Sequence, residues 1–158
     1  MSVNVLKPES DATGLRFAVL AATWNEHLVA RLVDAALDVL QHRGAAEADI
    51  EVRWVPGSYE LPVAAKWAAE SGRFDAVLAY GCVIKGETEH FRLVADAASQ
   101  GLMRVALDTG VPVLNGVLAA YDAEQAAARS GGEMGNTGAQ VALAGIAMAR
   151  HRRAVRST

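Results

Sequence analysis

The stretch FDAVLAYGCVIKGETEHF, residues 74–91, carries the pattern that decides the fold. Its first part, residues 74–84, is an almost continuous apolar run, which is typical of a strand buried on both faces of a sheet. A turn at Gly86 follows, and a helix is predicted from about Thr88 to Thr109. A buried strand that leads through a short turn into a helix is the repeating unit of a parallel α/β sheet.

The same alternation continues on both sides of this unit. Asn25 is predicted to cap the first helix, Gly44 to end it, and Pro62 to fit only the first turn of the second. The remaining expected elements are buried strands at 15–22 and 111–119, an alternating strand at 50–55, and helices at 25–42, 59–71, 123–129 and 137–152. This order predicts an α/β protein with three α/β/α layers around a parallel four-stranded sheet.

Length and composition favour one globular domain with an excess of apolar surface. The chain has 158 residues, of which 52% are hydrophobic, and we expect an N-terminal arm at 1–13 and a single domain at 14–158. No apolar run approaches the roughly 18 residues that a membrane helix needs. A subunit interface is the simplest destination for the remaining apolar surface.

Charge and cysteine content narrow the class of protein further. The net charge is −3 with both signs scattered, which argues against a nucleic-acid partner. The basic residues 151–156 are explained by a solvated helix end. Cys82 is the single cysteine, so neither an intrachain disulfide nor a paired-cysteine metal site is expected. The N-terminus lacks the apolar core of a secretory signal, and a cytoplasmic location is the default expectation.

Ligands of parallel sheets bind beyond the carboxyl ends of the strands. The segments to inspect are therefore residues 23–25, 56–60, 82–90 and 115–116. In the third, Gly86 and Thr88 stand where free backbone N–H groups at a helix start could bind phosphate, although many ordinary capped turns look the same. His90 shares that turn and could move protons near neutral pH, or it could be structural.

Other strand-end residues also have two explanations. Glu60 lies in the first turn of a predicted helix, where it either offsets the helix dipole or accepts hydrogen bonds from a polyol. Trp24 either packs in the core or offers its face to a planar ring. Arg129 is either a solvated helix-end cation or a guanidinium fixed for phosphate.

The combination of these motifs is more specific than any one of them. TWN (23–25), PGSYELP (56–62), VIKGETEHF (83–91), PVLNGVL (112–118) and an arginine before a glycine-rich loop that ends in GNTG (135–138) occur in this order. From about Leu15 to Arg150 the chain resembles the lumazine synthase family. The resemblance implies a flavodoxin-like subunit that uses no metal and no organic cofactor.

The resemblance also implies an activity in riboflavin biosynthesis. The family condenses 5-amino-6-(D-ribitylamino)uracil with 3,4-dihydroxy-2-butanone 4-phosphate to give 6,7-dimethyl-8-ribityllumazine, phosphate and water. It implies catalysis by His90. The implied pyrimidine-site residues are Trp24, Ser58, Tyr59, Glu60, Cys82, Val83, Ile84 and Asn115, and those of the phosphate site are Gly86, Glu87, Thr88 and Arg129, with Asn115 and Arg129 donated by a neighbouring subunit.

Three positions depart from the commonest family pattern. Arg92 stands where an acidic residue often assists the histidine, Thr137 replaces a lysine near the ring, and Asn115 occupies a position where many members carry an aromatic or other residue. These departures keep open a non-catalytic shell-forming or ligand-storage protein. A flavin-binding electron carrier is the other alternative, but the AATWNEH loop (21–27) lacks the hydroxyl-rich phosphate loop that it needs.

The resemblance implies an assembly as well. Family members form rings of five subunits, and some rings build paired pentamers or icosahedral shells of sixty subunits. The short segment RSGGEMGNTG (129–138) matches the connection found in shell-forming members, and its glycines permit a sharp bend. We therefore expect a homo-pentamer within an icosahedral shell, with riboflavin synthase as a possible further partner.

Overall fold

A four-stranded parallel sheet lies between two helical layers in the computed structural model, which describes residues 2–157. Met1 and Thr158, the outer ends of the predicted arm and domain, lie outside the described residues. The strands are β1 (Phe17–Ala22), β2 (Ile50–Val55), β3 (Ala76–Ile84) and β4 (Val113–Ala120), in the order β2-β1-β3-β4. The three-layer α/β prediction, with its flavodoxin-like strand order, is confirmed.

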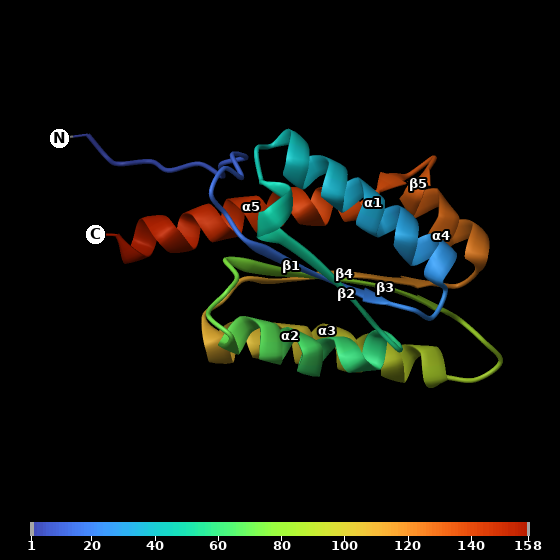
Figure 1. Ribbon diagram of the computed structural model, residues 1–158. Coiled ribbons are helices and arrows are strands. Elements are labelled where there is room, and N and C mark those ends of the chain that lie inside the picture. Colours follow the sequence, from blue (N-terminus) through green and yellow to red (C-terminus); the bar gives the residue numbers. More distant parts are fainter. Residues whose placement is uncertain (1, 158) are drawn as a thin grey trace.

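Two helices cover one face of the sheet and three cover the other (Figure 1). The first pair is α2 (Leu61–Glu70), which follows the 3-10 turn η2 (Ser58–Glu60), and α3 (His90–Thr109). The opposite layer holds α1 (Glu26–His42), α4 (Ala123–Arg129) and α5 (Thr137–Arg156), and a second 3-10 turn, η1 (Glu47–Asp49), precedes β2. Residues 2–11 are exposed and form neither helix nor strand, and their separation from a domain at 14–158 stays a prediction.

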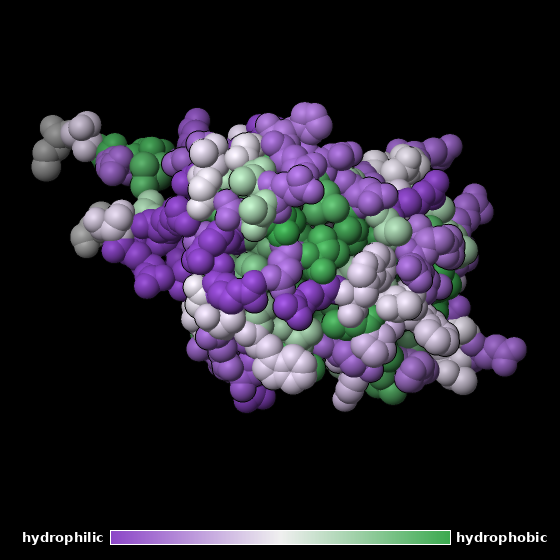
Figure 2. All heavy atoms as spheres, in the orientation of Figure 1, coloured by the Kyte–Doolittle hydropathy of each residue, from purple (hydrophilic) through white to green (hydrophobic). Residues whose placement is uncertain are grey.

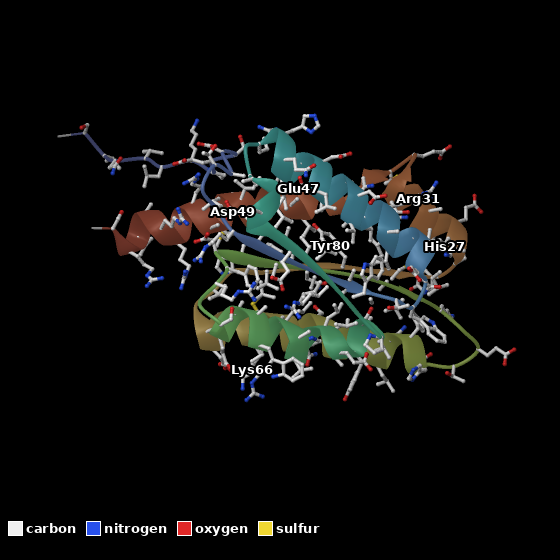
Figure 3. The ribbon with its side chains drawn as sticks, viewed as in Figure 1. His27, Arg31, Glu47, Asp49, Lys66 and Tyr80 are labelled. Atoms are coloured by element: carbon white, nitrogen blue, oxygen red, sulfur yellow. The ribbon has the colours of Figure 1, made fainter. Side chains whose placement is uncertain are left out.

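The core has one apolar cluster on each face of the sheet. Alternate residues of β1 and β3 enter one cluster or the other, so the apolar runs are buried on both sides, as expected of central parallel strands. Tyr80 lies between the sheet and the α1/α5 layer (Figure 3), fully buried, and its hydroxyl donates to the carbonyl of Gly138 at 2.9 Å. This bond ties the start of α5 to the middle of the sheet.

Four sequence-based expectations need correction, the fourth of them at the start of the helix after β3. The strand at 111–119 was expected to be buried, but β4 is an edge strand and only some of its residues are buried. The connection at 129–138 contains a small antiparallel pair, β5 (Ser130–Gly132) with β6 (Gly135–Asn136). Its glycine content had indicated a loop without strands. Asn25 precedes α1, yet its side chain makes no capping bond and its backbone is left-handed, with φ 61°.

The helix that follows β3 begins at His90, two residues later than expected. Residues 85–89 instead form a turn that extends beyond the sheet (Figure 1). Within residues 2–157, no helix combines the length and apolar content required to cross a membrane. Both termini lie at the end of the molecule opposite the 85–89 turn (Figure 1), so the carboxyl edge of the sheet is free of them.

Candidate active site

A cleft of about 750 Å³ opens at the carboxyl ends of the strands. The turn after β1, the η2 turn after β2, the end of β3 and the first turn of α3 all contribute walls. The sequence-predicted residues that line it are Trp24, Ser58, Tyr59, Glu60, Cys82, Val83, Ile84, Gly86, Thr88 and His90. The strand order brings these segments together, because β1 lies between β2 and β3 and all three end at the same edge.

Backbone hydrogen bonds attach the turn after β1 to the turn after β2. The amide of Thr23 donates to the carbonyl of Val55 at 2.8 Å, and that of Trp24 donates to the carbonyl of Pro56 at 3.2 Å. The Trp24 side chain is 74% exposed and that of Tyr59 is 66% exposed. Two large aromatic faces at the mouth of a cleft suit a planar ligand, since burying them would be favourable.

Ser58, a largely buried residue, directs its hydroxyl into this cleft. The residue is only 5% exposed, and its side chain makes no hydrogen bond to any other residue between 2 and 157. Gly81 of β3 packs directly on the Ser58 side chain, and a Cβ at that glycine would collide with the hydroxyl oxygen. No fully buried side-chain oxygen or nitrogen within residues 2–157 lacks a hydrogen-bond partner, so the Ser58 hydroxyl must open into the cleft, where water or a ligand can bond to it.

The turn from Lys85 to Glu89 carries the predicted anion site. The Lys85 amide donates to the carbonyl of Ala120 at 2.9 Å, which anchors the turn to β4. Its ammonium lies 5.6 Å from the centre of the Tyr121 ring, and Lys85 is not among the residues that line the cleft. Gly86 and Thr88 do line the cleft, ahead of the positive end of α3, and this arrangement favours an anionic group.

His90 is the first residue of α3, and its backbone amide donates to the Thr88 hydroxyl at 3.3 Å. Its ring makes no hydrogen bond within the described chain, so both ring nitrogens can reach a ligand. Arg92, the residue that departs from the family pattern, pairs with Glu89 at 3.4 Å on the outside of the helix. His27 is exposed at the start of α1 and does not line the cleft (Figure 3).

Three predicted residues lie outside the cleft of their own chain. Glu87 is exposed in the turn. Asn115 is exposed on β4, where its side-chain oxygen accepts a bond from the Val117 amide at 3.0 Å. Arg129 ends α4 with an exposed guanidinium that donates to the Gln125 carbonyl at 3.1 Å. One subunit therefore brings most of the predicted set together but not these three.

The cleft also has lining residues that are not among the predicted site residues: Pro56, Gly57 and Phe91, which lie within the quoted motifs, and Leu93 and Val94, which lie outside them. The helical spacing between His90 and Val94 could have indicated the last of these, because residues four apart share one helix face. Burial raises the pKa of the Cys82 thiol to about 11, so this cysteine stays protonated near neutral pH and lines the cleft as a small apolar group.

No group of three or more histidine, cysteine or acidic side chains is arranged to hold a metal ion in the part of the chain that the structure describes. The cleft presents the aromatic faces of Trp24 and Tyr59, the Ser58 hydroxyl, a turn suited to an anion, and one histidine. These features define an α/β protein with a small-molecule site suited to a planar ring and an anionic group, with acid–base chemistry available.

Comparison with known proteins identifies the family. The family model described as 6,7-dimethyl-8-ribityllumazine synthase matches residues 14–153. A protein of that name from Stenotrophomonas maltophilia (strain R551-3) is 52% identical over 133 residues, which is 84% of this chain and 86% of the relative. One from Desulfotalea psychrophila is 46% identical over 146 residues, covering 92% and 94% respectively. The chain belongs to the 6,7-dimethyl-8-ribityllumazine synthase family.

Proposed function

We propose that this protein catalyses the formation of 6,7-dimethyl-8-ribityllumazine in riboflavin biosynthesis. It condenses 5-amino-6-(D-ribitylamino)uracil with 3,4-dihydroxy-2-butanone 4-phosphate and releases phosphate and two waters. The observation that carries the proposal is the meeting, in one cleft, of His90, of Gly86 and Thr88, and of the Ser58 hydroxyl, which has no hydrogen-bond partner within residues 2–157. Family membership supplies the identity of the two substrates.

The reaction needs proton transfers but no change of oxidation state. The 5-amino group attacks the ketone carbon, and loss of water gives a Schiff base. Loss of a proton and of phosphate gives an enol, which tautomerises to a ketone. The ribitylamino nitrogen then attacks that carbonyl, and loss of the second water closes the ring. A site that holds both reactants together supplies much of the rate enhancement, and His90 exchanges protons with the reacting atoms.

The cleft residues divide between the two substrates. Trp24 stacks on the pyrimidine ring, and the backbone of Cys82, Val83 and Ile84 contacts the ring edge. Ser58, Tyr59 and Glu60 bind the ribityl chain, whose hydroxyls can satisfy the Ser58 side chain. The turn of Gly86, Glu87 and Thr88 binds the phosphate in the field of the α3 N-terminus.

Asn115 and Arg129 act on the cleft of a neighbouring subunit within a pentamer. Their position outside their own cleft is compatible with this role. Figure 2 shows apolar side chains gathered on the face where β2 crosses the front of the sheet, and Val52 and Trp54 of this edge strand are partly exposed. Burying such a surface in a subunit contact is favourable.

Activity is tested by mixing the protein with both substrates and following the appearance of lumazine absorbance. Turnover that needs both substrates supports the proposal. Binding of a lumazine or flavin without turnover would instead favour the non-catalytic alternative. His90→Gln serves as the control, because it keeps a polar side chain of similar size but cannot exchange protons in the same way.

The shared site is tested by mixing two variants that are each impaired when the phosphorylated substrate is limiting. Arg129→Ala and His90→Gln are unfolded and refolded together, so that some clefts combine an intact His90 with an intact neighbouring Arg129. Recovery of activity supports a site shared between subunits, and no recovery from a soluble mixed assembly contradicts it. Light scattering coupled to size exclusion tests the icosahedral shell: a particle of megadalton order supports it, whereas a pentamer or decamer mass rejects it.

Two further expectations complete the proposal. The protein acts in the cytoplasm, and riboflavin synthase is a candidate partner because that enzyme consumes the lumazine product. Co-purification of the two proteins at physiological salt would support the partnership.

A further inference from the structure

The turn between β1 and α1 contains an unusual backbone position. Asn25 has φ 61° and ψ 41°, and it is the only non-glycine residue with a positive φ among those that the structure describes. Asparagine tolerates this left-handed conformation better than most residues do. The conformation brings the chain sharply from the strand into the helix and leaves the preceding residue, Trp24, at the mouth of the cleft.

The side chain of Asn25 does not serve the helix that follows it. The carbonyl of Asn25 accepts the first bonds of α1, from the amides of Leu28 and Val29. The side-chain amide instead donates to the carbonyl of Cys82 at 2.8 Å. An asparagine expected to act as a helix cap is therefore directed across the sheet to a different strand.

This hydrogen bond extends the β1–β3 ladder beyond the last residues that the two strands pair. The pairing of β1 with β3 ends at Ala21 opposite Tyr80. Cys82 lies beyond that point, so its carbonyl has no partner from β1, and the Asn25 amide takes the place of the missing backbone N–H. Removing the amide would leave a polar group unpaired at a residue that is only 1% exposed.

The bond also attaches the turn after β1 to β3, whose end lines the cleft. On one side, the turn is attached to the β2 exit through the amide of Trp24 and the carbonyl of Pro56. On the other side, the Asn25 side chain attaches it to the β3 exit. Because the Trp24 indole is largely exposed, packing does not fix it. The position of Trp24 relative to the Cys82–Ile84 edge therefore depends on these two hydrogen bonds, one from the Trp24 amide and one from the Asn25 side chain.

We propose that Asn25 is a positioning residue of the ring site: its left-handed backbone and its amide hold Trp24 at a fixed distance from the Cys82–Ile84 edge. The inference rests on the proposed function, because it takes the pyrimidine to bind between these two walls. Asn25 contacts neither reactant, and it acts through Trp24 and through the Cys82 carbonyl.

Two variants remove the amide while keeping a residue that tolerates the left-handed backbone. Asn25→Gly adopts the left-handed conformation freely but lacks the amide. Asn25→Asp keeps the shape of the side chain and replaces the donor with an acceptor. In both, the KM for the pyrimidine should rise by about tenfold, consistent with a lost hydrogen bond at a buried carbonyl. The KM for the phosphorylated substrate and the value of kcat should change by less than about twofold.

Thr109→Val is the matched control. It removes the bond from the Thr109 hydroxyl to the Val105 carbonyl at 2.7 Å and the bond that this hydroxyl accepts from the Val111 amide at 3.2 Å, both at the opposite edge of the sheet. Its pyrimidine KM should equal that of the wild type. An Asn25→Gly protein that keeps the wild-type pyrimidine KM overturns the proposal, and so does an equal rise in the KM of both substrates.

Direct binding separates this inference from the proposed activity. With Trp54 and Trp67 replaced by phenylalanine, the Trp24 fluorescence is titrated with the pyrimidine substrate alone. If the wild type quenches but shows no turnover, the activity proposal fails, and a weaker affinity in Asn25→Gly still supports the positioning role. Quenching with unchanged affinity in the variant rejects that role. A wild type without any quenching rejects the stacked ring and the positioning role together.

Discussion

Two clefts of similar volume lie at opposite edges of the same sheet. The carboxyl-edge cleft measures about 750 Å³ and the amino-edge cleft about 900 Å³. At the amino edge, the protein satisfies its own polar groups: Asp75 accepts bonds from the Arg153 guanidinium and from the Arg16 amide, and Arg152 donates to the Gly110 carbonyl. At the carboxyl edge, the Ser58 hydroxyl and the His90 ring have no partner within residues 2–157.

Helix direction explains part of this contrast. Helices α1, α3 and α5 start toward the carboxyl edge and end toward the amino edge, so their positive ends face one cleft and their negative ends the other (Figure 1). Arg152 of α5 donates to the carbonyl of Gly110 just after α3, and Arg153 and Arg156 lie in the last turn of α5, so these cations offset the negative helix ends. The comparison teaches that polar groups left without a protein partner identify a binding site better than cavity volume does.

The largest expected effect is a loss of stability caused by a substitution at the amino edge, away from the reacting groups. Asp75→Ala removes a carboxylate that is 9% exposed, and it leaves the Arg16 amide and Arg153 without their partner. Because Arg153 is partly solvated, we expect a loss of about 3 kcal/mol of unfolding free energy, at the lower end for buried pairs. Urea unfolding at one fixed protein concentration measures it, and kcat of the folded enzyme should not change.

Asp108→Ala is the control for this prediction. Asp108 pairs with Arg104 at 3.4 Å between exposed side chains of α3, so its loss should cost no more than about 0.5 kcal/mol. Equal destabilisation by the two variants would show that the Asp75 network is no more important than a surface pair. A large drop in kcat for Asp75→Ala would show that the two edges are not independent.

The second prediction concerns a substitution at the carboxyl edge that lowers kcat and leaves the unfolding free energy nearly unchanged. His90→Gln should lower kcat by about 10²-fold, at the lower end for general acid–base assistance, because bringing the reactants together remains intact. The side chain is exposed and makes no hydrogen bond within the described chain, so the unfolding free energy should move by less than about 0.5 kcal/mol. Steady-state kinetics measures kcat, and an unchanged value would remove His90 from the mechanism.

The sequence predicted which residues form the carboxyl edge, but it did not predict the side-chain contacts at the amino edge. Apolar runs and turn residues predicted the strand at Ile50–Val55 with the bounds that the structure shows, and they placed every strand end that forms the cleft. This succeeded because parallel strands end at one edge, so local patterns determine which turns meet. Nothing local predicted the Asp75–Arg153 network, since its partners lie 78 residues apart.

The errors have the same origin. Asn25 has a side chain typical of a helix cap, and only the position of β3 shows that its amide is used elsewhere. The run at 111–119 is apolar enough for a central strand, but its place at the sheet edge is a property of the strand order. The contacts of Asn115 and Arg129 with a second subunit remain predictions, because they depend on the assembly.

A third prediction compares two arginines, one from each region. Arg153 is engaged by Asp75, whereas Arg129 donates only to the Gln125 carbonyl of its own helix. Arg129→Ala should raise the KM for the phosphorylated substrate about tenfold, as expected for one lost charge-assisted contact, and should leave the KM for the pyrimidine within about twofold. Steady-state kinetics with each substrate varied in turn measures this, and equal effects on both would contradict the phosphate role.

The last and smallest effect concerns the pH dependence of stability, and it distinguishes Cys82 from the reactive groups around it. Burial raises the pKa of this thiol to about 11 in the folded protein, against about 8.5 in an unfolded chain. Between these values the unfolded state binds fewer protons than the folded state, so stability is full below about pH 8.5 and falls as the pH rises toward 11, by at most about 1.4 kcal/mol per pH unit.

Urea unfolding of the wild type and of Cys82→Ala at pH 7.5, 9 and 10 isolates this contribution. Burial also raises the pKa of Tyr80, but an unfolded tyrosine ionises only near pH 10, and both proteins contain it. The variant should lose some stability at every pH through the smaller side chain, and its stability should fall less steeply between pH 7.5 and 9. Parallel curves would mean that Cys82 ionises as readily in the folded cleft as in the unfolded chain. The thiol would then belong with His90 among the groups available to a ligand, and the assignment of Cys82 as an apolar part of the cleft wall would be wrong.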